Sequence, residues 1–306
     1  MTDVALITGT SSGMGMHAAV HLAQRGLRVV ATMRDPRGAD RLHAAAEAAG
    51  VTLDVRALDV VDHAASAELV AAIVAEYGSI DVLVNNAGRG MVASAEQLSM
   101  EQIRDQLEVN YLAPVNLTKL VLPGMRQRGR GTILTVTSVG GAVGQPFADA
   151  YCGSKFAVEG FMQSLAVRFG VWVGVIEPAA VASDFVANAE RPGAGGSGPY
   201  APLLDAYLKR SSGSFASAQT AESAGAAIAD AVSSDTTRWG LSHLAIGVGY
   251  ALMTVAFIAC RSYLRDAGEE RWSAWALPFA VFGSALFPIL TGMEFASLAA
   301  AETNGD

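Results

Sequence analysis

A tyrosine and a lysine four residues apart, Tyr151 and Lys155, are the pair in this sequence with the clearest capacity for chemistry. On a helix, side chains at this spacing project from one face and can enter the same pocket. A phenol has an ordinary pKa of ~10, and a nearby ammonium favours the phenolate, which brings that pKa toward the range where acid–base catalysis works. The alternative is a surface tyrosine beside a solvated lysine, so the surrounding sequence must decide.

A glycine-rich turn follows a short apolar run near the N-terminus. Residues 4–8 have the length and content of a buried strand, and Gly9-Thr10-Ser11-Ser12-Gly13-Met14-Gly15 then leads into helical periodicity over residues 16–24. Strand, turn and helix in this order let the backbone approach a dinucleotide pyrophosphate, whose charge then lies at a helix N-terminus. The alternative is an ordinary glycine-rich turn between a strand and a helix.

The residues after the second expected strand, at 28–33, bear on the choice of dinucleotide. NAD sites usually place a ribose-binding carboxylate there, whereas this chain has Arg34, with Asp35 only afterwards. A guanidinium matches the geometry of a 2′-phosphate, so the sequence favours NADP(H) and leaves NAD(H) as the second choice. If Arg34 and Asp35 instead form a surface ion pair, this preference has no basis.

The rest of the chain alternates between strand-like and helical patterns. We expect strands at residues 52–58, 80–84, 132–137 and 171–176, and helices at 39–49, 63–77, 100–125 with an interruption near Pro114, 150–169 and 220–233. This alternation predicts an α/β fold with a Rossmann-type doubly wound parallel sheet, which binds ligands at the carboxyl ends of its strands. Asn85-Asn86-Ala87-Gly88 and Ser138 come where two of these strands end. Residues 187–217, turn-rich at 192–199, are expected to form a loop that is either an active-site lid or disordered.

Composition excludes several classes of protein. A net charge of −8 without a long basic run argues against a nucleic-acid partner. Cys152 and Cys260 are the two cysteines of the sequence, so we expect neither a disulfide framework nor a metal site. The first residues are too short and too acidic a segment for a signal peptide, which predicts a cytoplasmic catalytic portion.

The C-terminal region changes character. Residues 241–260 and 274–293 lack Asp, Glu, Lys and Arg, and each is about as long as the ~20 residues that a membrane helix needs. We therefore divide the chain into a Rossmann domain at 1–240 and a hydrophobic, helical extension at 241–306, which would form a two-helix membrane hairpin on the cytoplasmic face. In the alternative, residues 239–246 are a seventh edge strand, and the remainder packs on the domain or forms an oligomer contact.

Taken together, residues 3–240 resemble the short-chain dehydrogenase/reductase family. The motifs that carry this resemblance, in the family's order, are Thr8-Gly9-x3-Gly13-x-Gly15, Asp59, Asn85-Asn86-Ala87-Gly88, Asn110, Ser138 and Tyr151-x3-Lys155. The first two strands and the turn look like the NADP-using branch that includes 17β-hydroxysteroid and retinol dehydrogenases, although a substrate is not inherited with a fold. One departure is Ala179, where the family commonly has Gly after Pro178.

The resemblance implies a role for each of four catalytic residues. Tyr151 would exchange a proton with the substrate oxygen, and Ser138 would hydrogen-bond the same oxygen. Lys155 would lower the pKa of Tyr151 and hold the nicotinamide ribose. Asn110 would anchor a water molecule that links Lys155 to solvent.

The resemblance also implies a set of cofactor contacts and no metal. They are Gly9, Ser11, Ser12, Gly13, Met14, Gly15, Arg34, Asp59, Val60, Asn86, Ala87, Gly88, Tyr151, Lys155, Pro178, Val181 and Ser183. Asp59 and Val60 would lie by the adenine, and Asn86 with Gly88 by the adenosine ribose. Ser183 stands where a Thr often contacts the nicotinamide carboxamide.

The expected function is an NADP(H)-dependent oxidoreductase that interconverts a secondary alcohol and a ketone or aldehyde. A lipophilic substrate is favoured by the apolar extension, and we expect a homo-oligomer. Two alternatives stay open. The first is a catalytically silent NADP-binding sensor or scaffold on the same fold, and the second is a membrane protein whose Rossmann domain serves for docking.

Overall fold

The structure is a computed structural model that describes residues 2–165, 170–185, 187–192, 199–214 and 218–233. The chain divides into two compact units, Met1–Val232 and Ser233–Asp306. The predicted boundary at residue 240, the hydrophobic extension and the alternative edge strand lie outside the described residues. Within the described part of the chain, no helix is both long and apolar enough to cross a membrane.

Six parallel strands form the central sheet of the first unit. They are β1 (Val4–Thr8), β2 (Arg28–Met33), β3 (Asp54–Ala57), β4 (Val82–Asn85), β5 (Gly131–Val136) and β6 (Val171–Ile176), in the spatial order β3-β2-β1-β4-β5-β6. The order reverses between β1 and β4, where the chain crosses from one half of the sheet to the other. The predicted doubly wound parallel sheet is therefore confirmed. A second, two-stranded sheet pairs β7 (Val181–Ala182) with β8 (Gln219–Thr220).

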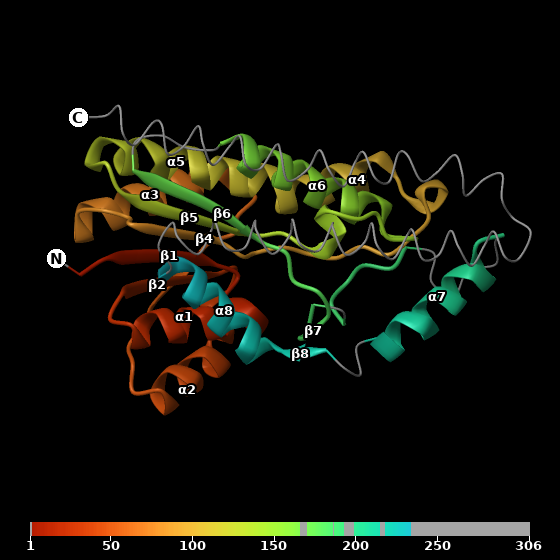
Figure 1. The fold of residues 1–306 in the computed structure, drawn as a ribbon, viewed down its shortest axis with the longest axis horizontal. Coiled ribbons are helices and arrows are strands. Elements are labelled where there is room, and N and C mark those ends of the chain that lie inside the picture. Colours follow the sequence, from red (N-terminus) through yellow and green to blue (C-terminus); the bar gives the residue numbers. More distant parts are fainter. Residues whose placement is uncertain (1, 166–169, 186, 193–198, 215–217, 234–306) are drawn as a thin grey trace, which may run out of the picture. The chain divides into compact units, whose positions relative to one another are not determined.

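Helices cover both faces of the large sheet (Figure 1). One face carries α1 (Gly13–Gln24), α2 (Asp40–Ala48) and α8 (Ala221–Ser233), and the other carries α3 (His63–Tyr77), α5 (Ala113–Arg128) and α6 (Asp149–Ser164). Successive residues of β1 point into opposite cores, Ile7 with the first helix layer and Leu6 with the second. This is why the strand sequence is apolar throughout instead of alternating.

The helix expected at 100–125 is interrupted by a π-helical turn. The structure has α4 (Met100–Leu107), a π-helical turn at Glu108–Leu112 and then α5, with Pro114 in the first turn of α5. A proline is tolerated there because it lacks an N–H that would have no partner at a helix start. The π turn carries Asn110 with its side chain buried, and such turns often lie at functional sites.

The region expected to be one long loop, residues 187–217, contains the helix α7 (Ala201–Ser214), so that prediction was wrong for its second half. Leu204 and Leu208, four apart, follow Pro202 in the first turn, a pattern typical of a short amphipathic helix. The neighbouring glycines and prolines concealed this pattern, because they are typical of loops.

The first turn of α1 tolerates no side chain at Gly15. A Cβ added there would lie 2.2 Å from Asn86 Nδ2 and 2.5 Å from the carbonyl oxygen of Gly9. Gly160, on the exposed side of α6, has no heavy atom within 4 Å of an added Cβ. Alanine substitutions at the two glycines therefore distinguish a steric effect from a change in helix propensity.

We expect Gly15→Ala to lower the free energy of unfolding by about 1–3 kcal/mol, because the backbone must move to relieve the overlap. Gly160→Ala should raise it by about 0.5–1 kcal/mol through helix propensity. Denaturant unfolding followed by circular dichroism measures both. Equal stability of Gly15→Ala and the parent protein would show that the turn is not packed as described.

Candidate active site

The residues that the sequence singled out gather at one edge of the sheet. In the spatial order of the strands, Asp59 follows β3, Arg34 follows β2, Gly9 follows β1, Asn86 follows β4, Ser138 follows β5 and Pro178 follows β6. All six strands are parallel, so these positions share the carboxyl edge, where ligands bind in such folds.

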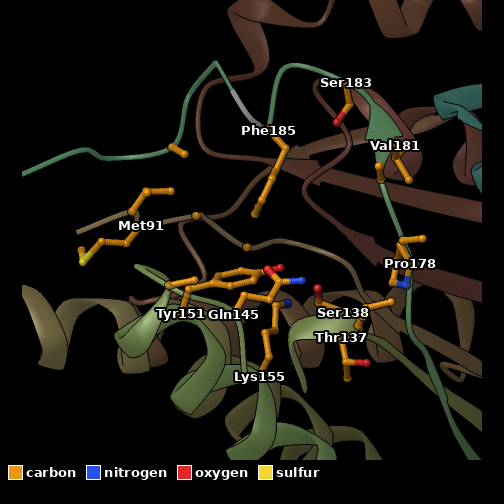
Figure 2. A pocket seen from close by; sticks show the side chains of 18 of the residues that line it. Met91, Thr137, Ser138, Gln145, Tyr151, Lys155, Pro178, Val181, Ser183 and Phe185 are labelled. Atoms are coloured by element: carbon orange, nitrogen blue, oxygen red, sulfur yellow. The ribbon is translucent and has the colours of Figure 1, made fainter. Parts of the chain in front are cut away.

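A cavity of about 590 Å³ opens at this edge (Figure 2). Nine of the residues that we predicted for the site line it, namely Met14, Asn86, Gly88, Ser138, Tyr151, Lys155, Pro178, Val181 and Ser183. The sequence analysis missed a further set in the wall, among them Met91, Gln145, Phe185 and Tyr207. These four come from loops and from α7, so no regular pattern indicated that they would meet.

Helix α6 presents Tyr151 and Lys155 to the cavity, as their spacing predicted. Lys155 is 5% exposed, and its Nζ donates a hydrogen bond to the carbonyl oxygen of Val136 at the end of β5, at 3.0 Å. Burial lowers the pKa of Lys155 to about 8, and the charge of Glu159, one turn further along α6, opposes this shift. The ammonium is therefore close to losing its proton near neutral pH.

Tyr151 is partly buried, and its surroundings act on its pKa in two directions. Burial raises the pKa of the phenol, and a hydrogen bond with the Ser138 side chain opposes this rise. We expected Lys155 to supply the lowering, but its ammonium binds the Val136 carbonyl instead, and Ser138 is the group that lowers the Tyr151 pKa. Phe185 points at Tyr151 from the other side of the cavity, with ring centroids 5.9 Å apart (Figure 2).

Ser138 is oriented by the short 3-10 turn at Val139–Gly141 that follows β5. Its Oγ accepts a hydrogen bond from the backbone N–H of Gly140 at 3.0 Å, which leaves the hydroxyl proton free to be donated. A side chain on Gly140 would come within 3.1 Å of the Tyr151 ring. The glycine thus lets the turn approach Tyr151 closely.

Asn110 connects the loop after β4 to helix α6. Its Oδ1 accepts from the backbone N–H of Arg89 at 3.0 Å, and its Nδ2 donates to the Arg89 carbonyl and to Ser154 Oγ, each at 3.0 Å. The loop passes so close that an added Cβ on Gly88 would lie 3.5 Å from Lys155 Nζ. The amide of Asn110 therefore holds this loop against the base of the Tyr151–Lys155 helix.

The glycine-rich turn is fastened to the end of β4. Thr8 Oγ1 accepts from the backbone N–H groups of Asn86 and Ala87 at 3.1 and 3.0 Å. In return, Asn86 Nδ2 donates to the carbonyl oxygens of Thr8 and Gly9 at 2.9 and 3.0 Å. Gly9 and Gly13 have φ values of +71° and +62°, which favour glycine, and they shape a backbone cradle before the N-terminus of α1.

Arg34 lies exposed just after β2. Asp35 binds Arg37 and not Arg34, with Arg37 Nη2 at 2.8 Å from Asp35 Oδ2, and this hydrogen bonding lowers the pKa of Asp35. The alternative of an Arg34–Asp35 surface pair is therefore wrong. Among the described residues, no acidic side chain forms an ion pair with Arg34.

The relatives found by comparison with known proteins agree with the resemblance seen in the sequence. The family model described as short chain dehydrogenase matches residues 3–192. Retinol dehydrogenase 8 of Homo sapiens is 43% identical over 202 residues, which are 61% of this chain and 64% of that protein. The 17-beta-hydroxysteroid dehydrogenase type 1 of Homo sapiens is 42% identical over 195 residues, 60% of this chain and 58% of that protein. The chain thus spans less than two thirds of the length of these relatives.

Solved structures agree with the fold. A short-chain dehydrogenase from Streptomyces avermitilis superposes with a TM-score of 0.68 at 30% identity, covering 78% of this chain and 86% of that one. Actinorhodin polyketide ketoreductase with NADPH superposes with a TM-score of 0.58 at 34% identity, covering 68% and 76%. With the family model matching 3–192, these likenesses show that the chain belongs to the short-chain dehydrogenase family.

Proposed function

We propose that this protein is an NADP(H)-dependent oxidoreductase that interconverts a secondary alcohol and a ketone or aldehyde. The observation that carries the proposal is the phenol of Tyr151, hydrogen-bonded to Ser138 on the wall of the cavity, with the buried ammonium of Lys155 one helical turn away. A sensor or scaffold on the same fold has no need of such a proton-handling group. This argues against the silent alternative.

The residues present fit a dinucleotide. Gly9 lets the turn lie close to Asn86, and an added Cβ on Gly9 or Gly15 would fill the narrow space against the Asn86 side chain. The turn leads into the N-terminus of α1, where backbone N–H groups and the helix dipole favour a pyrophosphate. Arg34, exposed at the end of β2, would hold the 2′-phosphate, and Ser11 and Ser12 lie in the same turn.

The relatives support this cofactor. The polyketide ketoreductase structure is described as containing NADPH, and a metagenomic short-chain oxidoreductase of 31% identity and TM-score 0.55 as a complex with NADP. When bound, NADP(H) supplies or accepts the hydride. The protein's own residues would bind the cofactor and the substrate, orient them, and donate or accept the proton.

Proton transfer is assigned to Tyr151. In the reductive direction its hydroxyl donates a proton to the carbonyl oxygen, while the Ser138 hydroxyl donates a hydrogen bond to the same oxygen and stabilises the developing charge. In the oxidative direction the phenolate takes the proton of the alcohol. Lys155 holds a positive charge beneath the site, and Asn110 keeps the neighbouring loop in place.

The cavity favours a lipophilic substrate. Its wall is largely apolar and includes Met91, Val92, Phe185 and Leu208. Retinol dehydrogenase 8 and 17-beta-hydroxysteroid dehydrogenase type 1 are named for lipophilic alcohols, which supports this class of substrate.

The cytoplasmic location, the homo-oligomer and membrane association through residues 241–306 stay predictions. The extension that would carry the membrane contact lies outside the described residues. The proposed chemistry does not depend on it.

Tyr151→Phe should lower kcat by roughly 10²–10⁴-fold, because the ring remains and only the proton donor is lost. NADPH affinity, measured by fluorescence titration, should stay within about a factor of three. Tyr207→Phe, which removes another phenol hydroxyl from the same cavity, is the matched control and should change kcat by less than about tenfold. Turnover by Tyr151→Phe at the parent rate would refute the assignment. A parent protein that binds NADPH but reduces no carbonyl compound would instead favour the sensor.

Arg34→Asp should shift cofactor preference from NADPH toward NADH by roughly 10- to 100-fold in the ratio of kcat/KM values. The change removes a charge-assisted bond to phosphate, worth about 1.5–3 kcal/mol, and adds a ribose acceptor. Arg104→Asp on the exposed side of α4 makes the same change of net charge and should leave the ratio unaltered. Equal use of both cofactors by the parent protein would show that Arg34 does not read the phosphate.

A further inference from the structure

Gln145 is a polar side chain on a largely apolar part of the cavity wall. It is half-buried and lines the cavity together with Met91 and Phe185. Figure 2 shows it beside Tyr151 and away from Ser183. Its amide offers two N–H donors and an oxygen that accepts. Neither the expected cofactor contacts nor the proton transfer proposed above uses this amide.

The Gln145 amide differs from other polar groups of the wall in having no partner. Thr137 Oγ1 and Lys155 Nζ each donate to a main-chain carbonyl oxygen, at 3.1 and 3.0 Å. The Gln145 side chain forms no hydrogen bond with any of the described residues. The Tyr207 hydroxyl is unbonded there as well, but it belongs to α7, which carries none of the reacting groups. The amide of Gln145 is therefore available to a molecule in the cavity.

A tight turn fixes the position of Gln145. The backbone N–H of Ala148 donates to the Gln145 carbonyl oxygen at 3.1 Å, with Pro146 second in the turn and Phe147 third. Phe147 has a φ of +59°, and this arrangement is typical of a type II turn, whose third residue is usually Gly or Asn. Pro146 also favours an extended backbone at Gln145. The chain thus accepts backbone strain to hold Gln145 in one place.

The backbone of Gln145 lies beside the reacting groups. Its N–H donates to Sγ of Cys152, the neighbour of Tyr151 on α6, at 3.4 Å. A Cβ added to Gly140 would lie 3.1 Å from the Tyr151 ring, 3.3 Å from Cys152 Sγ and 3.4 Å from Ser138 Oγ. These three groups therefore surround one point, and Gln145 is bonded to one of them. Its amide starts from a fixed position close to the substrate oxygen that Tyr151 and Ser138 would bind.

The surroundings of Gln145 are those expected of the substrate and not of the cofactor. Ser183, assigned to the cofactor, lies against the glycine-rich turn, since a Cβ added to Gly13 would come 3.4 Å from its Cβ. The turn that starts at Gln145 contacts the loop after β4 instead, where the backbone N–H of Ala93 donates to the Phe147 carbonyl oxygen at 2.8 Å.

We propose that Gln145 is a specificity-determining residue, which hydrogen-bonds a second oxygen of the substrate on a carbon close to the reacting one. The substrate class is then a lipophilic hydroxyketone or diketone, with the diol or hydroxyketone as the corresponding alcohol. An amide donates to a carbonyl oxygen and accepts from a hydroxyl, so it binds either form. The second oxygen takes no part in the transfer of hydride and proton. Turnover of this class rests on the proposed function, whereas its recognition by Gln145 does not.

The test compares simple ketones in the full chain. The substrates are octyl methyl ketone, analogues with one hydroxyl on the first or second carbon from the carbonyl, and the vicinal diketone. With NADPH, kcat/KM should be higher for at least one hydroxyl analogue than for the plain ketone, because a site built to bond an oxygen disfavours a ligand that lacks it.

Gln145→Met keeps the length of the side chain and removes its amide. The preference for the hydroxyl analogue should fall by roughly 5- to 50-fold, the effect of losing one hydrogen bond in a half-buried site. Since each variant is compared on the same substrates, differences in their intrinsic reactivity cancel. Gln127→Met, the same change on the exposed side of α5, should leave the preference unaltered. A parent protein that prefers no analogue, or an unchanged preference in Gln145→Met, would overturn the proposal.

Gln145→Glu provides an independent comparison, which decides alone if Gln145→Met does not fold. The carboxylate still accepts from a hydroxyl but has lost both N–H donors. The preference for the hydroxyl analogue should stay within about threefold, while the preference for the diketone over the plain ketone falls by about tenfold. Loss of both preferences, or of neither, contradicts direct bonding by Gln145.

Binding distinguishes a failure of this inference from a failure of the proposed function. In Tyr151→Phe with NADP⁺, calorimetry measures dissociation constants without turnover. Adding Gln145→Met should weaken binding of the hydroxyl analogue by roughly 5- to 50-fold and leave the plain ketone within about threefold. This difference in a parent protein that reduces no ketone would keep Gln145 as a recognition residue and refute the activity. Turnover with no such difference would keep the activity and refute this inference.

Discussion

The buried ammonium of Lys155 is the constraint on which the arrangement of this site depends. A charge that is almost removed from water is costly, and it persists only where fixed partners replace the solvent. Here the Val136 carbonyl at the end of β5 accepts a hydrogen bond from the ammonium, and the charge of Glu159 opposes the lowering of the Lys155 pKa by burial. The carbonyl belongs to the sheet and Lys155 to α6, so this hydrogen bond forms only when helix and sheet are docked.

The sheet supplies the second requirement, which is that side chains distant in sequence meet at one edge. Where the strand order reverses, four hydrogen bonds join Thr8 and Gly9, at the end of β1, to Asn86 and Ala87, which follow β4. These bonds bring the glycine-rich turn and the loop after β4 together. Asn110 then ties that loop to Ser154 on α6. The glycine-rich turn and the helix that carries Tyr151 and Lys155 are therefore joined by hydrogen bonds in which the side chains of Thr8, Asn86 and Asn110 take part.

The regular part of this arrangement could be predicted from the sequence, because buried strands are apolar runs and helices have a period. The bounds of α3 and of the strands at 28–33 and 171–176 agree with the structure. The π turn at Asn110 could not be predicted, since it depends on one residue of extra winding before Pro114. The burial of Glu159 escaped notice for a different reason. It arises only when α6 packs on the sheet, and a glutamate in a helix is by itself typical of a solvated surface.

The least regular segments form the part of the cavity that would meet the substrate. Phe147 has a φ of +59°, an unfavourable value for a residue with a side chain. Its carbonyl accepts from the backbone N–H of Ala93 at 2.8 Å, and its ring packs on Tyr207 of α7 with centroids 5.6 Å apart. These contacts compensate the strain and join two loops to helix α7 beside the cavity. In the proposed function, proton transfer would rest on the sheet and α6, whereas the shape of the substrate would be recognised by these irregular segments, one of which packs Phe185 on the Tyr151 ring.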